Sequence, residues 1–406
     1  MKSKTGHETL HAYYREQAVL PTHGGFRSPA ELQAYEKQRR WLFTDKLYLP
    51  PRVFDGAKLL EYGPDSGENA LVFATWGARC TLVEPNPKAH PAIKDYFERF
   101  RLSGRLAGLE QADIAGYAQR KGALEKFDII DAEGFIYTVK PDALWMDLFA
   151  RQLESGGLAV IFYYEKFGSF LELLPKVIQA QYRRLTGAPS LDAAQALFAA
   201  KWASIPHKRP MQSWVMDVLE NPFVRLRYFY EPQDLCRKMQ EKGFTLYSSW
   251  PSYKDGLDVH WFKKTLSAEE RLRSQDDFIA RSRLSHMFGR KLFLLHIEPG
   301  WEQALSGLLD ATDALIDGFD KELAEQCVRY LTTIEAIVDS GAVMADAADK
   351  SAVFATLRSL QRIFALLAEG RAKELAAYCN EDAAFLGAWG MPSHFAVFRY
   401  EPAENT

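Results

Sequence analysis

The sequence predicts a doubly wound α/β domain that is followed by an all-helical C-terminal extension. Between residues 57 and 163, short apolar segments alternate with stretches of helical pattern, which is typical of a parallel sheet with helices on both faces. Beyond residue 267 the pattern is almost entirely helical. The chain has 406 residues, 47% of them hydrophobic and 25% charged, so it is long enough for two or more domains.

Five core strands are expected in the α/β domain. Continuous apolar runs such as Phe127-Asp-Ile-Ile suit strands that are buried on both faces of a sheet. An antiparallel pair at residues 243–250 and 259–264 is expected to close the domain near residue 265. The core strands are placed at Lys58–Tyr62, Cys80–Glu84, Leu106–Gln111, Phe127–Ala132 and Gly157–Tyr163.

Helical segments flank this domain on both sides. Residues 1–56 are expected to form an N-terminal helical cap, in which Ser28-Pro-Ala-Glu31 has the N-cap, proline and acid of a helix start. Residues 266–406 are expected to form a bundle of about four helices, because apolar residues recur at helical spacing. The bundle ends in a strand-like run, Phe395–Tyr400, which is expected to return to the sheet and hold the bundle against it.

Composition excludes several classes of protein. A net charge of −3 gives no nucleic-acid signal, no segment has the apolar length of a membrane span, and the first residues lack the apolar core of a secretory signal. The widely spaced Cys80, Cys236, Cys327 and Cys379 show no metal-ligand spacing. We therefore expect buried free thiols, a cytoplasmic protein and no metal.

The most informative segment runs from residue 58 to residue 86. A strand ends in Glu61-Tyr-Gly63-Pro-Asp65-Ser-Gly67, and the next strand ends in Glu84-Pro-Asn. Glycines let the backbone approach a ligand closely, and a carboxylate at the end of the second strand is placed to accept the hydroxyls of a ribose. A dinucleotide is disfavoured, because Asp65 stands where the second glycine of Gly-x-Gly-x-x-Gly should be. An ordinary strand-to-helix turn is the structural alternative.

This loop resembles the first motif of class I S-adenosylmethionine-dependent methyltransferases, with Asp65 in place of the middle glycine. The resemblance covers about residues 40–265 and implies a Rossmann-like seven-stranded sheet at residues 57–265, with residues 166–222 inserted as a substrate lid. It implies that Glu84 binds the ribose, that Pro85 and Asn86 border the adenine, and that Asp113 contacts the adenine amino group. The implied cofactor-binding residues are Glu61, Gly63, Pro64, Asp65, Ser66, Gly67, Glu84, Pro85, Asn86, Asp113, Ile114, Ala132 and Glu133.

The resemblance also places catalytic and acceptor-binding candidates. The end of the fourth strand lies beside the transferred methyl group in this family, so Glu133 and Tyr137 are candidates there, and His207 in the lid is a possible base. Each has a structural alternative: Glu133 as a helix cap, Tyr137 as a packing residue, and the lid as a solvated basic loop. The acceptor-binding candidates are Glu165, His207, Arg209, Trp214 and Asp217.

Two functions remain open at this point. The first is a methyltransferase that acts on an oxygen atom of a small polar acceptor, such as a sugar hydroxyl or a carboxyl group. The second is a non-catalytic scaffold that binds S-adenosylmethionine. The sequence leaves three roles open for the helical C-terminal region: formation of a homodimer, closure of the acceptor site, or binding of a partner protein.

Overall fold

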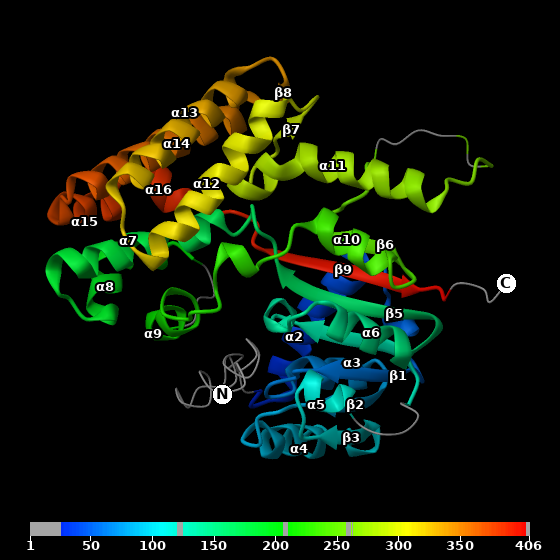
Figure 1. Cartoon of the computed structure of the whole chain (residues 1–406). Helices are drawn as coiled ribbons and strands as arrows, with labels where there is room; N and C mark the ends of the chain where they lie inside the picture. Colours follow the sequence, from blue (N-terminus) through cyan, green and yellow to red (C-terminus); the bar gives the residue numbers. More distant parts are fainter. Residues whose placement is uncertain (1–25, 120–124, 206–209, 257–260, 262, 403–406) are drawn as a thin grey trace. The chain divides into compact units, whose positions relative to one another are not determined.

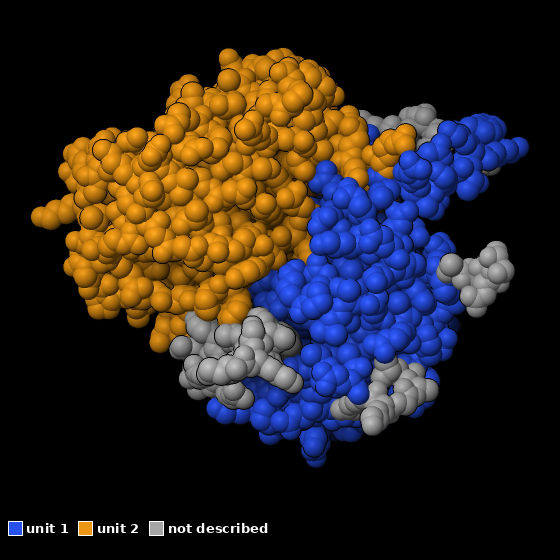
Figure 2. Space-filling model, viewed as in Figure 1, with its two compact units in different colours: residues 1–163, 232–272, 394–406 blue, residues 164–231, 273–393 orange. Residues whose placement is uncertain are grey.

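The chain forms two compact units, each built from separate stretches of sequence (Figure 2). The computed structural model describes residues 26–119, 125–205, 210–256, 261 and 263–402. Unit 1 contains Met1–Tyr163, Pro232–Leu272 and His394–Thr406, and unit 2 contains Tyr164–Glu231 and Arg273–Ser393. The segment 166–222, expected as an insertion of the sheet domain, thus belongs to the same unit as most of the C-terminal helices.

Unit 1 contains a seven-stranded mixed sheet, with the strand order β3-β2-β1-β4-β5-β9-β6 (Figure 1). Neighbours among the first five strands pair in parallel, as the continuous apolar runs predict. The five core strands and the Rossmann-like sheet are therefore confirmed. The strands are β1 (Lys58–Tyr62), β2 (Arg79–Val83), β3 (Leu106–Glu110), β4 (Phe127–Glu133), β5 (Leu153–Tyr164), β6 (Phe244–Trp250) and β9 (Ser393–Tyr400).

The C-terminal strand β9 lies between β5 and β6 in this sheet (Figure 1). It pairs antiparallel with β6, so that Trp250 lies opposite Phe395. The partner predicted for β6, residues 259–264, lies partly outside the described residues, and its described residues Trp261, Lys263 and Lys264 are not in a strand. The position of β9 follows from burial, because Phe395-Ala-Val-Phe398 is covered on both faces, whereas Lys263 and Lys264 are exposed. Residues 257–260 and 262 lie outside the described part.

Helices cover both faces of the sheet in unit 1. Apolar residues of α2, α3 and α4 pack with Leu59 and Ile129 on one face, and Tyr117 of α5 and Phe149 of α6 contact Tyr62 on the other. The predicted N-cap is confirmed, since the Ser28 side chain accepts a hydrogen bond from the Glu31 amide. The bounds are α2 (Pro29–Trp41), η1 (Leu42–Lys46), η2 (Pro51–Val53), α3 (Glu68–Thr75), α4 (Ala89–Arg99), η3 (Ser103–Arg105), α5 (Ile114–Ala118), η4 (Ile136–Thr138), α6 (Ala143–Gln152) and α10 (Pro232–Gln240).

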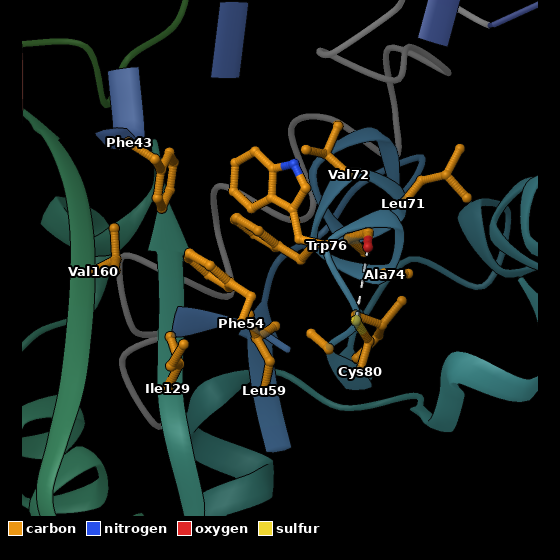
Figure 3. Packing of buried hydrophobic residues seen from close by; sticks show 14 of the residues in the cluster. Phe43, Phe54, Leu59, Leu71, Val72, Ala74, Trp76, Cys80, Ile129 and Val160 are labelled. Carbon is orange, nitrogen blue, oxygen red and sulfur yellow. Dashed lines mark hydrogen bonds between the residues drawn. The ribbon is translucent and has the colours of Figure 1, made fainter. Parts of the chain in front are cut away.

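An aromatic cluster forms the core between α3 and the sheet (Figure 3). The rings of Phe54 and Phe73 stack with centroids 5.2 Å apart, and Phe43 meets both rings edge-on. Trp76 closes the cluster. Because Phe43 follows α2 directly in the sequence, this packing fixes the N-terminal helix against the same face as α3.

Unit 2 is almost entirely helical. Its two stretches of sequence are joined by ion pairs, in which Arg225 and Arg227 both bind Asp313 and Asp317 of α12. The elements that lie wholly in this unit are α7 (Phe170–Thr186), α8 (Ser190–Ala203), α9 (Met211–Trp214), η5 (Val215–Leu219), η6 (Leu226–Tyr228), β7 (Phe293–Leu294), α12 (Pro299–Asp317), α13 (Lys321–Asp339), β8 (Val343–Met344), α14 (Ala347–Glu369), α15 (Ala372–Glu381) and α16 (Ala383–Gly387). Helix α11 (Ala268–Phe288) begins in unit 1 and ends in unit 2.

Two expectations from composition are tested in the described residues. All four cysteines are buried free thiols, as predicted. By length and composition, α14 is the one helix of the described part that is apolar enough to cross a membrane, and half of its most apolar window is buried inside the protein.

The position of β9 makes a testable prediction about truncation. Deleting residues 393–406 removes the buried Val397 and Phe398, and each large apolar side chain contributes about 1.5–3 kcal/mol. We expect the melting temperature of the sheet unit to fall by more than about 8 °C, measured by circular dichroism. A deletion of residues 403–406, which leaves β9 intact, is the control. Equal stability of the two truncated chains would contradict the role given to β9.

Candidate cofactor site

The loop after β1 has the backbone conformation that the glycine pattern predicts. Gly63 and Gly67 have φ values of 66° and 92°, and a Cβ atom on Gly63 would lie 2.8 Å from the Phe135 ring. Asp65 is also left-handed, with φ of 50°. Aspartate is among the few residues that tolerate this region. Asp65 therefore adopts locally the conformation that a glycine would supply.

Glu84 follows β2 and connects this loop to the next one. Its two carboxylate oxygens accept hydrogen bonds from the backbone amides of Asp65, at 3.1 Å, and Asn86, at 2.6 Å. The side chain is buried, and burial raises the pKa of its carboxyl group to about 7. The ribose-binding candidate thus stands next to the glycine loop, as the order of the motifs predicts.

At the end of β4, Glu133 is held by an ion pair. The two terminal nitrogens of Arg39 in α2 donate to its two oxygens, at 3.0 and 2.5 Å, and Asn69 of α3 donates to one of them at 3.2 Å. Asn69 in turn accepts a hydrogen bond of 2.6 Å from the Tyr35 hydroxyl. The Arg39 guanidinium lies over the rings of Phe43 and Phe73. Glu133 is therefore a fixed, charge-compensated group.

Two further acids are buried beside this ion pair. Glu61 of β1 is 2% exposed and Asp131 of β4 is 1% exposed, and the two residues lie opposite each other on neighbouring strands. Burial, followed by the charge of Glu133, raises the pKa of both carboxyl groups well above the usual range. This end of the sheet therefore holds more buried acids than buried cations among the described residues.

A family comparison decides what this arrangement belongs to. A family model described as a methyltransferase domain matches residues 35–249, which is more than half of the chain. The chain belongs to this methyltransferase family. Its methyl donor is S-adenosylmethionine. No curated protein matches the chain.

Several solved structures resemble this methyltransferase remotely. TehB from Haemophilus influenzae is 16% identical, with a TM-score of 0.25, over 31% of this chain and 46% of TehB, so the chain spans about half of its length. The N-methyltransferase NodS from Bradyrhizobium japonicum WM9, in complex with S-adenosylhomocysteine, is 18% identical (TM-score 0.27; 38% and 74% of the two chains). PKMT2 from Rickettsia typhi, in complex with the same compound, is 14% identical (TM-score 0.39; 60% and 49%).

The residues of the methyltransferase unit fit the donor. Glu61 has one buried oxygen without a hydrogen-bond donor among the described residues, and the glycine loop leaves no side chain at Gly63 and Gly67. Asp113 caps α5 and accepts a hydrogen bond of 2.6 Å from the Gly116 amide, and Ile114 is buried beside it. The remaining predicted positions, Pro64, Ser66, Pro85, Asn86 and Ala132, lie in the same loops or at the end of β4.

The other predicted site residues have different surroundings. Tyr137 is 3% exposed in η4 of unit 1. Glu165, Trp214 and Asp217 are all buried in unit 2, where Trp214 stacks on Trp202. His207 and Arg209 lie outside the described residues.

Sequence reasoning missed Arg39, Asn69, Tyr35 and Asp131. No local pattern marks the first three. Arg39 and Asn69 reach Glu133 from two helices that are distant from it in sequence, and Tyr35 reaches it through Asn69. Asp131 carried a usable signal: it lies two residues before Glu133 on a predicted strand, and residues two apart share a face. An acid among apolar neighbours on that face is a candidate for the site.

The Arg39–Glu133 pair predicts a characteristic pattern of stabilities. Arg39→Met leaves the Glu133 carboxylate without its counter-ion, and breaking a buried pair in this way costs about 3–5 kcal/mol. The double variant Arg39→Met/Glu133→Gln should recover most of this loss, as measured by urea unfolding. If both variants lose the same stability, the loss comes from packing of Arg39 over the aromatic rings and not from the ion pair.

Glu84 predicts a pH dependence of stability. Because its pKa lies at about 7 in the folded protein against an ordinary 4.5, the folded state keeps a proton that the unfolded chain has lost. The free energy of unfolding should therefore fall as the pH rises between these values, by about 3 kcal/mol from this group. Glu84→Gln should show a correspondingly flatter profile in urea titrations from pH 4 to 8. Parallel profiles would contradict the assignment.

Proposed function

We propose that this methyltransferase transfers the methyl group of S-adenosylmethionine to an oxygen atom of a small polar metabolite, such as a sugar hydroxyl or a carboxyl group. The family supports the methyl transfer. The observation that carries the choice of a small acceptor is the surplus of acids in unit 1. Glu61, Glu84 and Asp131 are buried with raised pKa values, and the buried Arg39 is already paired with Glu133.

This charge distribution bears on the class of acceptor. Proteins that bind nucleic acids neutralise phosphates with clustered lysines and arginines. A nucleic-acid acceptor would therefore favour positive charge at the site, and not the acids found here. Buried acids do not repel an uncharged hydroxyl, which favours a hydroxyl over an ionised carboxyl group as the acceptor. The sequence at the end of β4, Asp131-Ala-Glu-Gly, also lacks the Asn-Pro-Pro-Tyr pattern of amino-directed enzymes that act on nucleic acids.

In this proposal, different residues of unit 1 bind different parts of S-adenosylmethionine. Glu61 accepts from the amino-acid end, Glu84 accepts from the ribose hydroxyls, and Asp113 and Ile114 border the adenine. Bound S-adenosylmethionine supplies a methyl group that is activated by its sulfonium. Because that activation resides in the donor, the protein's tasks are to position the acceptor oxygen and to accept its proton.

The general base is assigned by elimination among the predicted groups. Glu133 is engaged by Arg39 and Asn69, which makes it a positioning group, and the Tyr137 side chain is buried. His207 keeps the role of base, since imidazole titrates near neutral pH. Glu165, Arg209, Trp214 and Asp217 stay proposals for binding the acceptor.

Turnover distinguishes the enzyme from a scaffold that only binds the cofactor. We expect transfer of radiolabel from methyl-labelled S-adenosylmethionine to a base-stable methyl ether or a base-labile methyl ester in a small-molecule extract of the source cells, and none to the nucleic-acid fraction. Label in RNA or DNA would overturn the proposal. Binding of S-adenosylhomocysteine without turnover on any fraction would favour the scaffold.

Two variants test the assigned residues in this assay. His207→Gln should lower kcat by about 10²- to 10⁴-fold, the usual contribution of a general base, with little change in the dissociation constant of S-adenosylhomocysteine. Glu84→Ala should instead weaken that binding, measured by isothermal titration calorimetry. Unchanged binding in Glu84→Ala would contradict the cofactor site. Homodimer formation and a cytoplasmic location stay predictions, the first of them testable by sedimentation equilibrium.

A further inference from the structure

Asp131 is a buried acid to which the family resemblance gives no role. It lies opposite Glu61 in the register of β1 and β4, and partners in the register of neighbouring strands project from the same face of a sheet. The two side chains are 1% and 2% exposed. The structure thus places two carboxyl groups side by side below the glycine loop, on the face that α2 and α3 cover.

Neither side chain is fully satisfied by the protein. Both oxygens of Asp131 and one oxygen of Glu61 meet no hydrogen-bond donor in the described residues. The neighbouring carboxylate of Glu133 can only share a proton with Asp131. Leaving an ionised carboxylate buried without a donor is costly, so the pair needs either a proton or a cation from outside.

The nearby protein groups do not supply that cation. Arg39 directs both terminal nitrogens to Glu133, and the other titratable neighbours, Glu68 of α3, Glu84 after β2 and Glu133 of β4, are acids. Tyr35 of α2 and Cys80 of β2 also face these acids, and burial raises the pKa of the Tyr35 hydroxyl to about 12 and that of the Cys80 thiol above its usual value. Both are therefore neutral near pH 7.

We propose that Asp131 and Glu61 together bind the α-ammonium group of the cofactor's amino-acid end. The proposal rests on the proposed cofactor site and adds a second carboxylate to it. In the free protein the pair holds at least one proton, and the incoming ammonium group displaces it. An ammonium group suits two adjacent acceptors, because it has three N–H donors. Its positive charge favours loss of the shared proton, since hydrogen bonds to ionised carboxylates are stronger.

The proposal predicts that one variant, Asp131→Asn, keeps or gains thermal stability but loses affinity for the cofactor. Asp131→Asn replaces a buried carboxyl group that has no hydrogen-bond donor among the described residues by a neutral amide of the same shape, so the free protein should melt at the same or a higher temperature. The same variant should bind S-adenosylhomocysteine about tenfold or more weakly, by calorimetry. A purely structural role for Asp131 would instead lower stability. Asp128→Asn, at the exposed start of the same strand, is the matched control and should change the affinity little.

A second ligand isolates the ammonium group. 5′-Methylthioadenosine has the adenosine of the cofactor but lacks the amino-acid end, so its affinity should be equal in wild type and Asp131→Asn. Proton release gives an independent readout: in buffers of different ionisation enthalpy, wild type should release more protons on binding S-adenosylhomocysteine than Asp131→Asn does.

The outcomes separate this inference from the proposed function. Equal weakening of both ligands in Asp131→Asn, or unchanged binding of S-adenosylhomocysteine with unchanged proton release, would overturn the ammonium assignment and leave the methyltransferase proposal intact. Failure of the wild-type protein to bind S-adenosylhomocysteine would overturn the cofactor site itself. If Asp131→Asn fails to fold, Glu61→Gln with the same pair of ligands repeats the test from the opposite strand.

Discussion

The ion pair between Arg39 and Glu133 is the interaction on which the acidic end of the sheet depends. Arg39 is the buried cation that lowers the pKa of both Glu61 and Asp131 against the effects of burial and of their acidic neighbours. Its guanidinium lies over Phe43 and Phe73, so the charge is attached to the aromatic core. A carboxylate that is fixed in this way keeps its place when a ligand arrives, which is the property a positioning group requires.

The path of the chain imposes a second constraint, on how the sheet is completed. After β5 the chain enters unit 2, returns with α10 and β6, leaves again, and returns last with β9. Because β9 lies between β5 and β6, the seven-stranded sheet is complete only when the C-terminal strand is in place. Until then β5 exposes an unpaired edge, which is a surface prone to pairing with other chains. The sheet unit therefore depends on residues far outside the segment that carries the family motifs.

The sequence predicted the parts of the fold that are encoded locally. The order and the approximate bounds of β1 to β5 follow from apolar runs between glycine-bearing turns, and the start of α2 follows from Ser28 and Pro29. The pairing of β6 with β9 was not predicted, because Val259–Lys264 is nearer in sequence and apolar in part, while the pairing with β9 depends on burial over both faces. At the site, Glu61 and Glu84 were predicted from their place at strand ends. Arg39 was not, because an arginine on a helix gives no signal until its partner is known.

The two units show why a perturbed pKa does not by itself mark a ligand site. In unit 2, burial lowers the pKa of Lys176 and Lys201 to about 7. This change is larger than the rise in the pKa of Glu84 in unit 1. Yet Lys176 donates to three backbone carbonyls, and Lys201 donates to two and lies over two aromatic rings.

These lysines are satisfied within the fold, so their shifted pKa values reflect a structural role in joining distant segments of unit 2. Asp131 and Glu61 are buried as deeply but have oxygens that the described protein groups leave without donors. A fold retains such groups at a cost in stability only where something else compensates them. For Asp131 and Glu61 it is the unsatisfied acceptors, more than the size of any pKa shift, that support our proposal of a site for a positively charged group of the ligand.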